Sequence, residues 1–329
     1  MQRKKSTMRI GLGQFNELSD DKLAFIKQIG VDEFQMNFYH CPLSDDGYLH
    51  YEDLQSLRAR GTAAGLRLAA IENVPISYYD RCMLGLPGRD EQLANMQRTI
   101  RNLGKAGIPI FGYHWASTGV AREKNDAVLA SGARGTRFEL AAHANDPHER
   151  GRVFTDEEIW ENYEYYMERI LPVAEEAGVK LALHPDDPPV ESLGGVARIM
   201  RSFENFKRAM DAFDSPYHGL DFCMGCWSEM GGHENVIRAL RHFGAQAKIF
   251  YIHFRDVQGP VTCFNECYIG DGNVDTLEVI RVLKEVGFDG FMIPDHVPKV
   301  DGDSAWSRQG RAHAVGYMKA LLEIADKLD

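Results

Sequence analysis

The sequence lacks any apolar run that approaches the roughly 20 residues of a membrane-spanning helix. Its first residues, MQRKKSTMRI, are basic, but no apolar signal core follows them. We therefore expect a cytoplasmic protein that has no membrane partner and in which residues 1–7 form a flexible tail.

Positive charge is also in short supply. Lys and Arg total 37 against 48 Asp and Glu, which gives a formal net charge of −11. A nucleic-acid partner would require a basic patch that neutralises phosphates, so we expect no such partner. A small anionic substrate remains compatible with this balance, because a single site can be locally positive.

Cysteine is scarce, with six residues in a chain of 329. Few cysteines in a long chain without a signal sequence indicate a reducing compartment and free thiols. Cys223 and Cys226 form a C-x-x-C pair, which alone is a weak indication of redox or zinc chemistry. The sequence has no second C-x-x-C, so we give a thioredoxin-like protein little weight.

What the sequence does contain is a regular alternation of apolar strand patterns and helical patterns. The predicted strands are residues 8–13, 32–36, 66–72, 108–114, 179–184, 217–223, 247–254 and 290–295. The predicted helices are residues 20–29, 51–64, 89–106, 155–177, 202–212, 235–243, 275–286 and 310–328. Apolar strands that alternate with helices are typical of a parallel sheet covered on both faces, and eight such units close as a (β/α)8 TIM barrel.

Glycines mark the junctions between these helices and strands. They stand in KQIGV, TAAGL, GKAGI, EEAGV and KEVGF, where a glycine typically ends a helix. We see no linker or change of composition, so we expect one catalytic domain over residues 8–329. The sequence is also compatible with a homo-oligomer. Two long insertions, residues 115–154 and 255–274, follow the fourth and seventh strands, where they could cover an active site.

Metal-competent side chains recur at the carboxyl ends of the predicted strands, which is where barrels of this kind build their active sites. His184, Cys223, His253 and Asp295 stand at or near the ends of the fifth to eighth strands, at intervals of 39, 30 and 42 residues. Each interval matches one strand–helix unit, so the four side chains should meet on one rim. Imidazole, thiolate and carboxylate all bind divalent transition metals. We therefore predict one metal ion held by these four residues.

Each of these residues also has an ordinary structural explanation. A single strand-end histidine more often makes structural hydrogen bonds, a lone buried cysteine is usually a small hydrophobe, and Asp295 could cap a turn. Four such residues at successive strand ends favour the metal site. Asp186 and Asp187, which follow His184 in LALHPDDPPV, are expected to orient its ring.

At these residues the sequence resembles the D-mannonate dehydratase family, which are metal-dependent sugar-acid lyases on a xylose-isomerase-like TIM barrel. The resemblance covers most of the chain, in the segments GLRLAAIENVPIS, GRDEQLANMQRTIRNLGKAGI, LALHPDDPP, FCMG, IHFRDV, PDHVP and GRAHAVGYMKAL. It implies Mn²⁺ or Fe²⁺ at the four predicted ligands and His296 as an acid/base residue. It also implies a sugar-acid substrate and a place in hexuronate degradation.

The C-x-x-C pair is one departure from the family's pattern. The family usually has a serine where this chain has Cys226. Gly225 suggests a turn that points the side chains of Cys223 and Cys226 apart. We therefore predict that Cys226 is neither a disulfide partner of Cys223 nor a metal ligand.

A second departure concerns proton transfer. The family has an acid/base tyrosine before the last helix, but the segment DGDSAWSRQGR of this chain has Trp306 there and no tyrosine. Tyr113, His114 or a metal-bound water is then expected to take that role. The residues expected to contact the substrate are Glu72, Arg255, Arg311 and Trp306. An arginine of this set would pair with the substrate carboxylate, although an ordinary ion pair is an equally good explanation.

These observations together predict a hydro-lyase. It would convert D-mannonate or a related aldonate to a 2-keto-3-deoxy sugar acid by removing the C2 proton and expelling the C3 hydroxyl. One alternative is a metal-dependent sugar isomerase or epimerase on the same barrel, although such enzymes usually rely on carboxylate-rich metal sites. The other alternative is a non-catalytic paralogue that binds a sugar acid.

Overall fold

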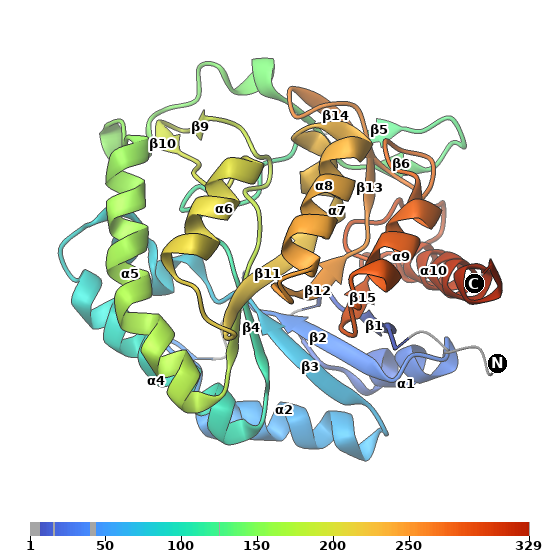
Figure 1. The fold of residues 1–329 in the computed structure, drawn as a ribbon, viewed down its shortest axis with the longest axis horizontal. Coiled ribbons are helices and arrows are strands. Elements are labelled where there is room, and N and C mark those ends of the chain that lie inside the picture. Colours follow the sequence, from blue (N-terminus) through green and yellow to red (C-terminus); the bar gives the residue numbers. More distant parts are fainter. Residues whose placement is uncertain (1–6, 16, 40–43, 125, 329) are drawn as a thin grey trace.

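The main sheet is a closed barrel of eight parallel strands (Figure 1). It is seen in a computed structural model that describes residues 7–15, 17–39, 44–124 and 126–328, so residues 1–6 of the predicted tail lie outside the described residues. Around the barrel the order is β1-β15-β12-β11-β8-β4-β3-β2, and β2 pairs with β1 to close it. The strands are β1 (Arg9–Leu12), β2 (Glu33–Asn37), β3 (Arg67–Glu72), β4 (Ile110–Tyr113), β8 (Lys180–Leu183), β11 (His218–Cys223), β12 (Ile249–His253) and β15 (Phe291–Ile293).

Helices that follow these strands surround the barrel (Figure 1). The larger ones are α1 (Asp20–Gln28), α2 (Tyr51–Ala63), α4 (Arg89–Ala106), α5 (Asp156–Ala177), α6 (Phe203–Ala212), α8 (Gly232–Gly244), α9 (Thr276–Glu285) and α10 (Arg308–Leu328). The boundaries follow local chemistry: α5 begins after a capping box between Thr155 and Glu158 and is capped at its C-terminus by Gly178, whose φ of 67° is left-handed. The predicted (β/α)8 barrel is confirmed.

The apolar core of the barrel consists of two clusters of buried residues. Most of the buried apolar residues lie in one large cluster that includes side chains of both the helices and the strands. A smaller cluster joins barrel residues of small and large size, among them Ala70, Ala182, Phe250 and Phe291. Small side chains beside aromatic rings allow a narrow barrel to fill without voids.

The described parts of the two insertions pair with each other. The insertion after β4 contains β7 (Arg137–Glu139), and the insertion after β12 contains β13 (Asp256–Gln258) and β14 (Cys263–Cys267). These strands form an antiparallel sheet in the order β13-β14-β7, with Phe138 and Phe264 buried beside it. Because both insertions leave from carboxyl ends of strands, this sheet stands at the end of the barrel where the site was predicted.

Short elements complete the rim. They are α3 (Asp80–Leu84), α7 (Met224–Glu229), the hairpin β5 (Ala127–Val128) with β6 (Arg134–Gly135), and the hairpin β9 (Ser192–Leu193) with β10 (Val196–Ala197). The helix α7 starts directly after β11, at a position where the sequence suggested a turn. None of the described helices combines the length and the apolar character that crossing a bilayer would require.

Candidate active site

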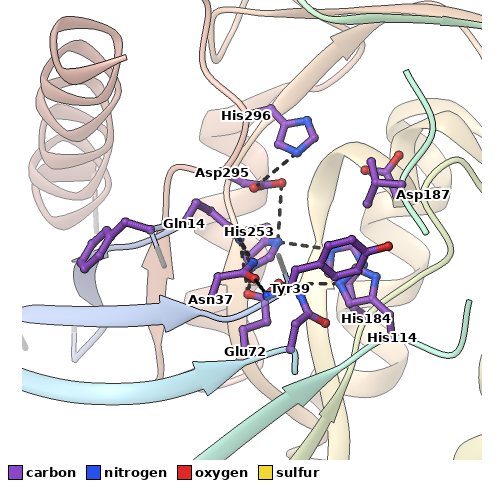
Figure 2. Close-up of a pocket in the computed structure, with 13 residues that line it drawn as sticks. Gln14, Asn37, Tyr39, Glu72, His114, His184, Asp187, His253, Asp295 and His296 are labelled. Atoms are coloured by element: carbon purple, nitrogen blue, oxygen red, sulfur yellow. Dashed lines mark hydrogen bonds and ion pairs between the residues drawn. The ribbon is translucent and has the colours of Figure 1, made fainter. Parts of the chain in front are cut away.

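A cavity of about 310 Å³ opens at the carboxyl end of the barrel (Figure 2). Its lining combines histidines, carboxylates and amides with a few apolar side chains. The lining residues are Gln14, Phe15, Asn37, Tyr39, Glu72, Asn73, His114, Val120, His184, Asp187, His253, Asp295 and His296. A polar cavity of this size can enclose a small hydroxylated acid.

The structure brings the four predicted metal ligands together. His184 Nε2 lies 3.2 Å from His253 Nδ1, and His253 Nδ1 lies 3.6 Å from Asp295 Oδ2. Ligand atoms of Cys223, His253 and Asp295 are all within 4.8 Å of one another. Two imidazole nitrogens, one sulfur and one carboxylate oxygen on buried side chains form a donor set that fits a divalent transition metal.

Strand register explains this convergence. Cys223 on β11 is directly paired with His253 on β12, and His253 is in turn paired with Ile293 on β15, two residues before Asp295. The backbone N–H of His184 donates to the carbonyl of Tyr113 at the end of β4, which holds that residue at the same level. Neighbouring parallel strands therefore present the four side chains to one point.

The Cys223 sulfur is held in a form suited to metal binding. Burial opposes ionisation, but a hydrogen bond from Cys226 and the charge of Arg255 hold the pKa of the Cys223 thiol well below its usual range. The Arg255 guanidinium donates to Cys223 Sγ over 3.1 Å and to Cys226 Sγ over 3.0 Å. The thiolate is the form that binds metal.

The geometry expected for the C-x-x-C pair needs a correction. The ligand atoms of His184, Cys223 and Cys226 lie within 4.8 Å of one another, so the two sulfurs are not turned apart. Gly225 lies inside α7, and residues three apart on one helical turn face the same side. Both cysteines are free thiols in this structure.

Two carboxylates behind His253 orient its ring. His253 Nε2 lies 2.8 Å from Glu72 Oε2 and 3.3 Å from Asp221 Oδ2, which leaves Nδ1 facing the other predicted ligands (Figure 2). Burial opposes ionisation of Glu72, but His253 and His114 keep the pKa of that carboxyl well below its usual range. Glu72, expected to contact substrate, lines the cavity but has this oxygen engaged by His253. Burial raises the pKa of Asp221 to about 8, and sequence reasoning missed this acid although it interrupts an apolar strand.

His184 is oriented differently from the sequence-based prediction. Its Nδ1 lies 2.6 Å from the carbonyl of Pro185, and its ring stacks on that of His114 at 4.0 Å. Asp186 instead accepts a hydrogen bond from the Met200 backbone, and Asp187 accepts from arginines. The expectation that these two carboxylates orient His184 is therefore wrong, because both are engaged by other groups and the nitrogen that they were to hold binds the carbonyl of Pro185.

His296 stands at the cavity and is held from behind by Glu266. Its Nδ1 lies 2.8 Å from Glu266 Oε1, and Arg122 donates to the same oxygen over 2.7 Å. Burial works against the charged imidazole, but Asp295 and Glu266 raise its pKa above the usual value. The side chain keeps 31% of its area exposed, which makes it the most open of the site histidines. Sequence reasoning gave no signal for Glu266, which comes from the insertion strand β14.

His114 also lines the cavity. Its Nε2 is buried, has no hydrogen-bond partner among the described residues and lies 3.7 Å from Glu72 Oε1. Burial lowers the pKa of His114 to about 4, so its ring is neutral near neutral pH. A neutral imidazole with a free nitrogen can accept a proton.

Several predicted site residues are not brought to the cavity. Tyr113 points toward the helices, where its hydroxyl lies 3.2 Å from that of Tyr163 and 3.3 Å from His218 Nε2. Arg255 is fully buried behind the cysteines, so its expected contact with the substrate carboxylate finds no support in this geometry.

Arg311 and Trp306 lie behind the rim as well. The Arg311 guanidinium donates to the backbone carbonyls of Pro294 and Trp306. The Trp306 indole N–H donates to the carbonyl of Gln14, and its ring packs edge-on against Phe15. Both residues therefore support the loops that shape the cavity, and the predicted substrate contact finds no support for either.

Amides at the ends of β1 and β2 line the cavity and were missed. Asn37 donates to Gln14 Oε1 over 2.7 Å, and Gln14 Nε2 donates to Glu72 Oε2 over 3.3 Å (Figure 2). Such groups recognise hydroxyls of a small ligand. The signal that identifies them is their place at or just beyond the carboxyl ends of the first two strands, where polar side chains can face the site.

In sequence and in structure, the chain is similar to known mannonate dehydratases. A family model described as D-mannonate dehydratase (UxuA) matches residues 8–153 and 144–329. A mannonate dehydratase from Thermotoga maritima is 30% identical over 318 residues, covering 84% of this chain and 87% of that protein. The crystal structure of a mannonate dehydratase from Streptococcus suis serotype 2 has a TM-score of 0.88 at 27% identity and covers 98% of this chain and 95% of that one. An L-ribulose 3-epimerase, at 15% identity and a TM-score of 0.63, shares the fold.

Proposed function

The chain belongs to the D-mannonate dehydratase family, and from this premise we propose that its cavity dehydrates D-mannonate or a closely related aldonate to a 2-keto-3-deoxy sugar acid. The protein is thus a hydro-lyase. The observation that carries the proposal is the convergence of two imidazoles, a thiolate and a carboxylate beside a cavity of about 310 Å³ that also presents His296.

We assign the metal to His184, Cys223, His253 and Asp295, with Mn²⁺ or Fe²⁺ as the ion. The mixed donor set fits a divalent transition metal, and the resemblance to the family implies these two ions. When bound, such an ion supplies Lewis-acid stabilisation of negative charge on substrate oxygens. The remaining steps belong to the side chains of the chain.

His296 is proposed as the general acid. Glu266 binds its Nδ1 and therefore leaves Nε2 to face the cavity. The raised pKa favours the protonated ring, whose Nε2–H can donate a proton to the departing C3 hydroxyl. Water then leaves, and the enol that remains becomes the 2-keto-3-deoxy acid.

His114 is proposed as the general base that takes the C2 proton. Its Nε2 makes no hydrogen bond among the described residues and lies 3.7 Å from Glu72 Oε1, and stacking on His184 fixes the ring plane. The C2 proton is weakly acidic because the neighbouring carboxylate is already negative, so removal of this proton requires a base held close to C2. Tyr113, the other residue expected for this role, faces the helix layer.

The test is turnover of a panel of aldonates and aldarates by Mn²⁺-loaded protein, read as formation of 2-keto-3-deoxy acid. We expect activity on D-mannonate or a close stereoisomer, and none after the metal is chelated. A product that retains all its hydroxyls would identify a sugar isomerase or epimerase. Metal binding without turnover of any acid would identify a non-catalytic sugar-acid-binding protein, and either result would overturn the dehydratase assignment.

A further inference from the structure

The C-x-x-C pair has a geometry that the proposed dehydration does not use. Cys223 is the last residue of β11, and Cys226 lies in the first turn of α7, which follows it without a break. Both thiols are fully buried. Their sulfurs belong to one group of ligand atoms within 4.8 Å of each other, together with His184. A disulfide requires the sulfurs to approach to about 2 Å, which is a short movement from this arrangement.

One guanidinium holds both sulfurs. Arg255 donates from Nε to Cys223 and from Nη2 to Cys226, at 3.1 and 3.0 Å. The guanidinium is fixed in turn by Glu229 at 3.1 Å and Glu266 at 3.0 Å. A fixed cation that binds both thiols keeps the two sulfurs side by side, which is the arrangement that thiol–disulfide chemistry requires.

The pair also adjoins the proposed metal site, because Cys223 is one of its four ligands. A sulfur that is bonded to another sulfur no longer carries the charge that binds a metal. Oxidation of the pair would therefore remove one of the four proposed ligands while leaving the backbone of β11 and α7 in place.

We propose that Cys223 and Cys226 form a reversible redox site, in which a hydroperoxide converts the two thiols to a disulfide and the oxidised chain releases its metal. Formation of the disulfide stands on the geometry of the pair. Release of the metal rests on the proposed function, since it requires Cys223 to be a ligand.

The chemistry balances with a peroxide as oxidant. The Cys223 thiolate attacks one peroxide oxygen, so that an S–O bond forms, the O–O bond breaks and hydroxide leaves. The Cys226 sulfur then attacks Cys223, the S–S bond forms, and the sulfenic hydroxyl leaves with the Cys226 proton as water. Two thiols are oxidised and one hydrogen peroxide is reduced to two waters once the first hydroxide has taken a proton from solvent.

The experiment uses the full chain after metal removal by a chelator. The protein is treated with hydrogen peroxide, free thiols are alkylated, and peptides are analysed by mass spectrometry with and without a reductant. We expect a peptide containing residues 223 and 226 that has lost the mass of two hydrogen atoms and regains it on reduction. Mn²⁺ binding, measured by calorimetry, should fall by more than ~100-fold on oxidation, beyond the usual loss for removing an outer partner of a ligand, and should recover with reductant.

Matched variants separate the pair from general oxidation. Cys226→Ser and Cys226→Ala should bind Mn²⁺ when reduced but form no internal disulfide, and two substitutions guard against a fold defect in one of them. Cys263→Ser removes an exposed cysteine on β14 and should behave as the parent chain.

Each outcome decides one part of the proposal. The absence of a link between residues 223 and 226 in the metal-free chain would overturn the redox site, and so would a loss of Mn²⁺ binding on oxidation that is as large in the Cys226 variants as in the parent chain. A linked chain that still binds Mn²⁺ as tightly as the reduced chain would overturn metal release. A reduced chain that never binds Mn²⁺ would instead overturn the proposed metal site, and the disulfide result would stand independently.

Discussion

The histidines of the site differ at the residue scale in what holds each ring. His253 is held by two carboxylates, Glu72 and Asp221, whereas His184 is held by the carbonyl of Pro185. His296 is held by Glu266 from an insertion strand. The partner of one ring nitrogen determines which nitrogen faces the cavity, so each histidine is prepared for a different task by its neighbour.

Replacing His296 by Asn tests the proposed acid. Asn can keep a hydrogen bond to Glu266 but cannot donate a proton as an acid. We expect His296→Asn to retain its metal and to lower kcat by roughly 10²-fold or more, the usual scale for loss of a general acid. His313→Asn, on the exposed side of α10, is the matched control and should turn over normally. A wild-type rate in the His296 variant would assign the acid to another group.

A second histidine, which does not line the cavity, should make stability depend on pH. His218 is fully buried beside the hydroxyls of Tyr113 and Tyr163, and burial lowers its pKa from 6.5 to about 4. The ring is neutral in both states above pH 6.5. Below that pH the unfolded chain binds a proton that the folded chain refuses, so stability is lost as pH falls toward 4. The expected loss between pH 7 and pH 5 is about 2 kcal/mol from this group.

Urea unfolding of the parent chain and of His218→Gln over this pH range measures the effect. The variant has no titrating group at position 218. Its free energy of unfolding should therefore fall less steeply as the pH is lowered, even if it is less stable at pH 7. Parallel curves for the two proteins would show that His218 titrates alike in the folded and unfolded states.

At the scale of elements, the site depends on segments outside the repeating barrel unit. The antiparallel sheet β13-β14-β7 joins the two insertions, and it delivers Glu266 to His296. Arg122, from the insertion after β4, pairs with both Glu266 and Asp187. The barrel strands thus position the proposed metal ligands, while the insertions position the proposed acid.

This division explains how much the sequence could predict. The period of the apolar pattern and the placement of glycines identify eight repeating strand–helix units. The spacing of His184, Cys223, His253 and Asp295 follows from those units alone. The partners of His296 and His184 depend on how irregular segments fold back, which no local pattern encodes. The direction of the Tyr113 side chain was also missed, because a strand-end residue can face either the barrel or the helix layer.

The packing of α4 against α5 offers a test at this scale. Gly104 lies where a Cβ atom would come 2.4 Å from the carbonyl oxygen of Ala177, so Gly104→Ala must push the helices apart. We expect a loss of about 1–3 kcal/mol in unfolding free energy, the usual cost of overpacking. Gly316→Ala, on an exposed face of α10 with open space around it, should instead gain about 0.5–1 kcal/mol. Thermal melts of both variants measure whether stability falls in the first and rises in the second. If both substitutions destabilise the protein, the contact between α4 and α5 is not the reason for the loss.

On the scale of the whole molecule, a buried charge network links the barrel to its insertions. Arg122 and Arg255 pair with Asp187 and Glu266, and Arg255 also pairs with Glu229. These five residues come from the loops after β4 and β8, the end of β12, α7 and β14. Breaking one member would leave a buried charge without its partner, which costs more than the intact pair contributes. The network therefore connects the segments that carry the site residues to the insertions that surround them.

The proposed metal should stabilise the entire barrel, because its four ligands come from four neighbouring strands. In the order β15-β12-β11-β8, these strands form half of the closed sheet. The unfolded chain separates the ligands by 39, 30 and 42 residues and has no comparable site. Mn²⁺ that binds the folded chain alone adds about 2.7 kcal/mol of stability at 100 times its Kd.

A shift in Tm measures this coupling. The parent chain should melt several degrees higher with Mn²⁺ than with a chelator, since about 1 kcal/mol corresponds to roughly 2–4 °C in a large domain. His184→Ala removes a proposed ligand and should abolish the shift, whereas His313→Ala should keep it. An equal shift in the His184 variant would mean that Mn²⁺ binds and stabilises the protein at another site. The four proposed ligands would then not be the metal site, even if the protein is a dehydratase.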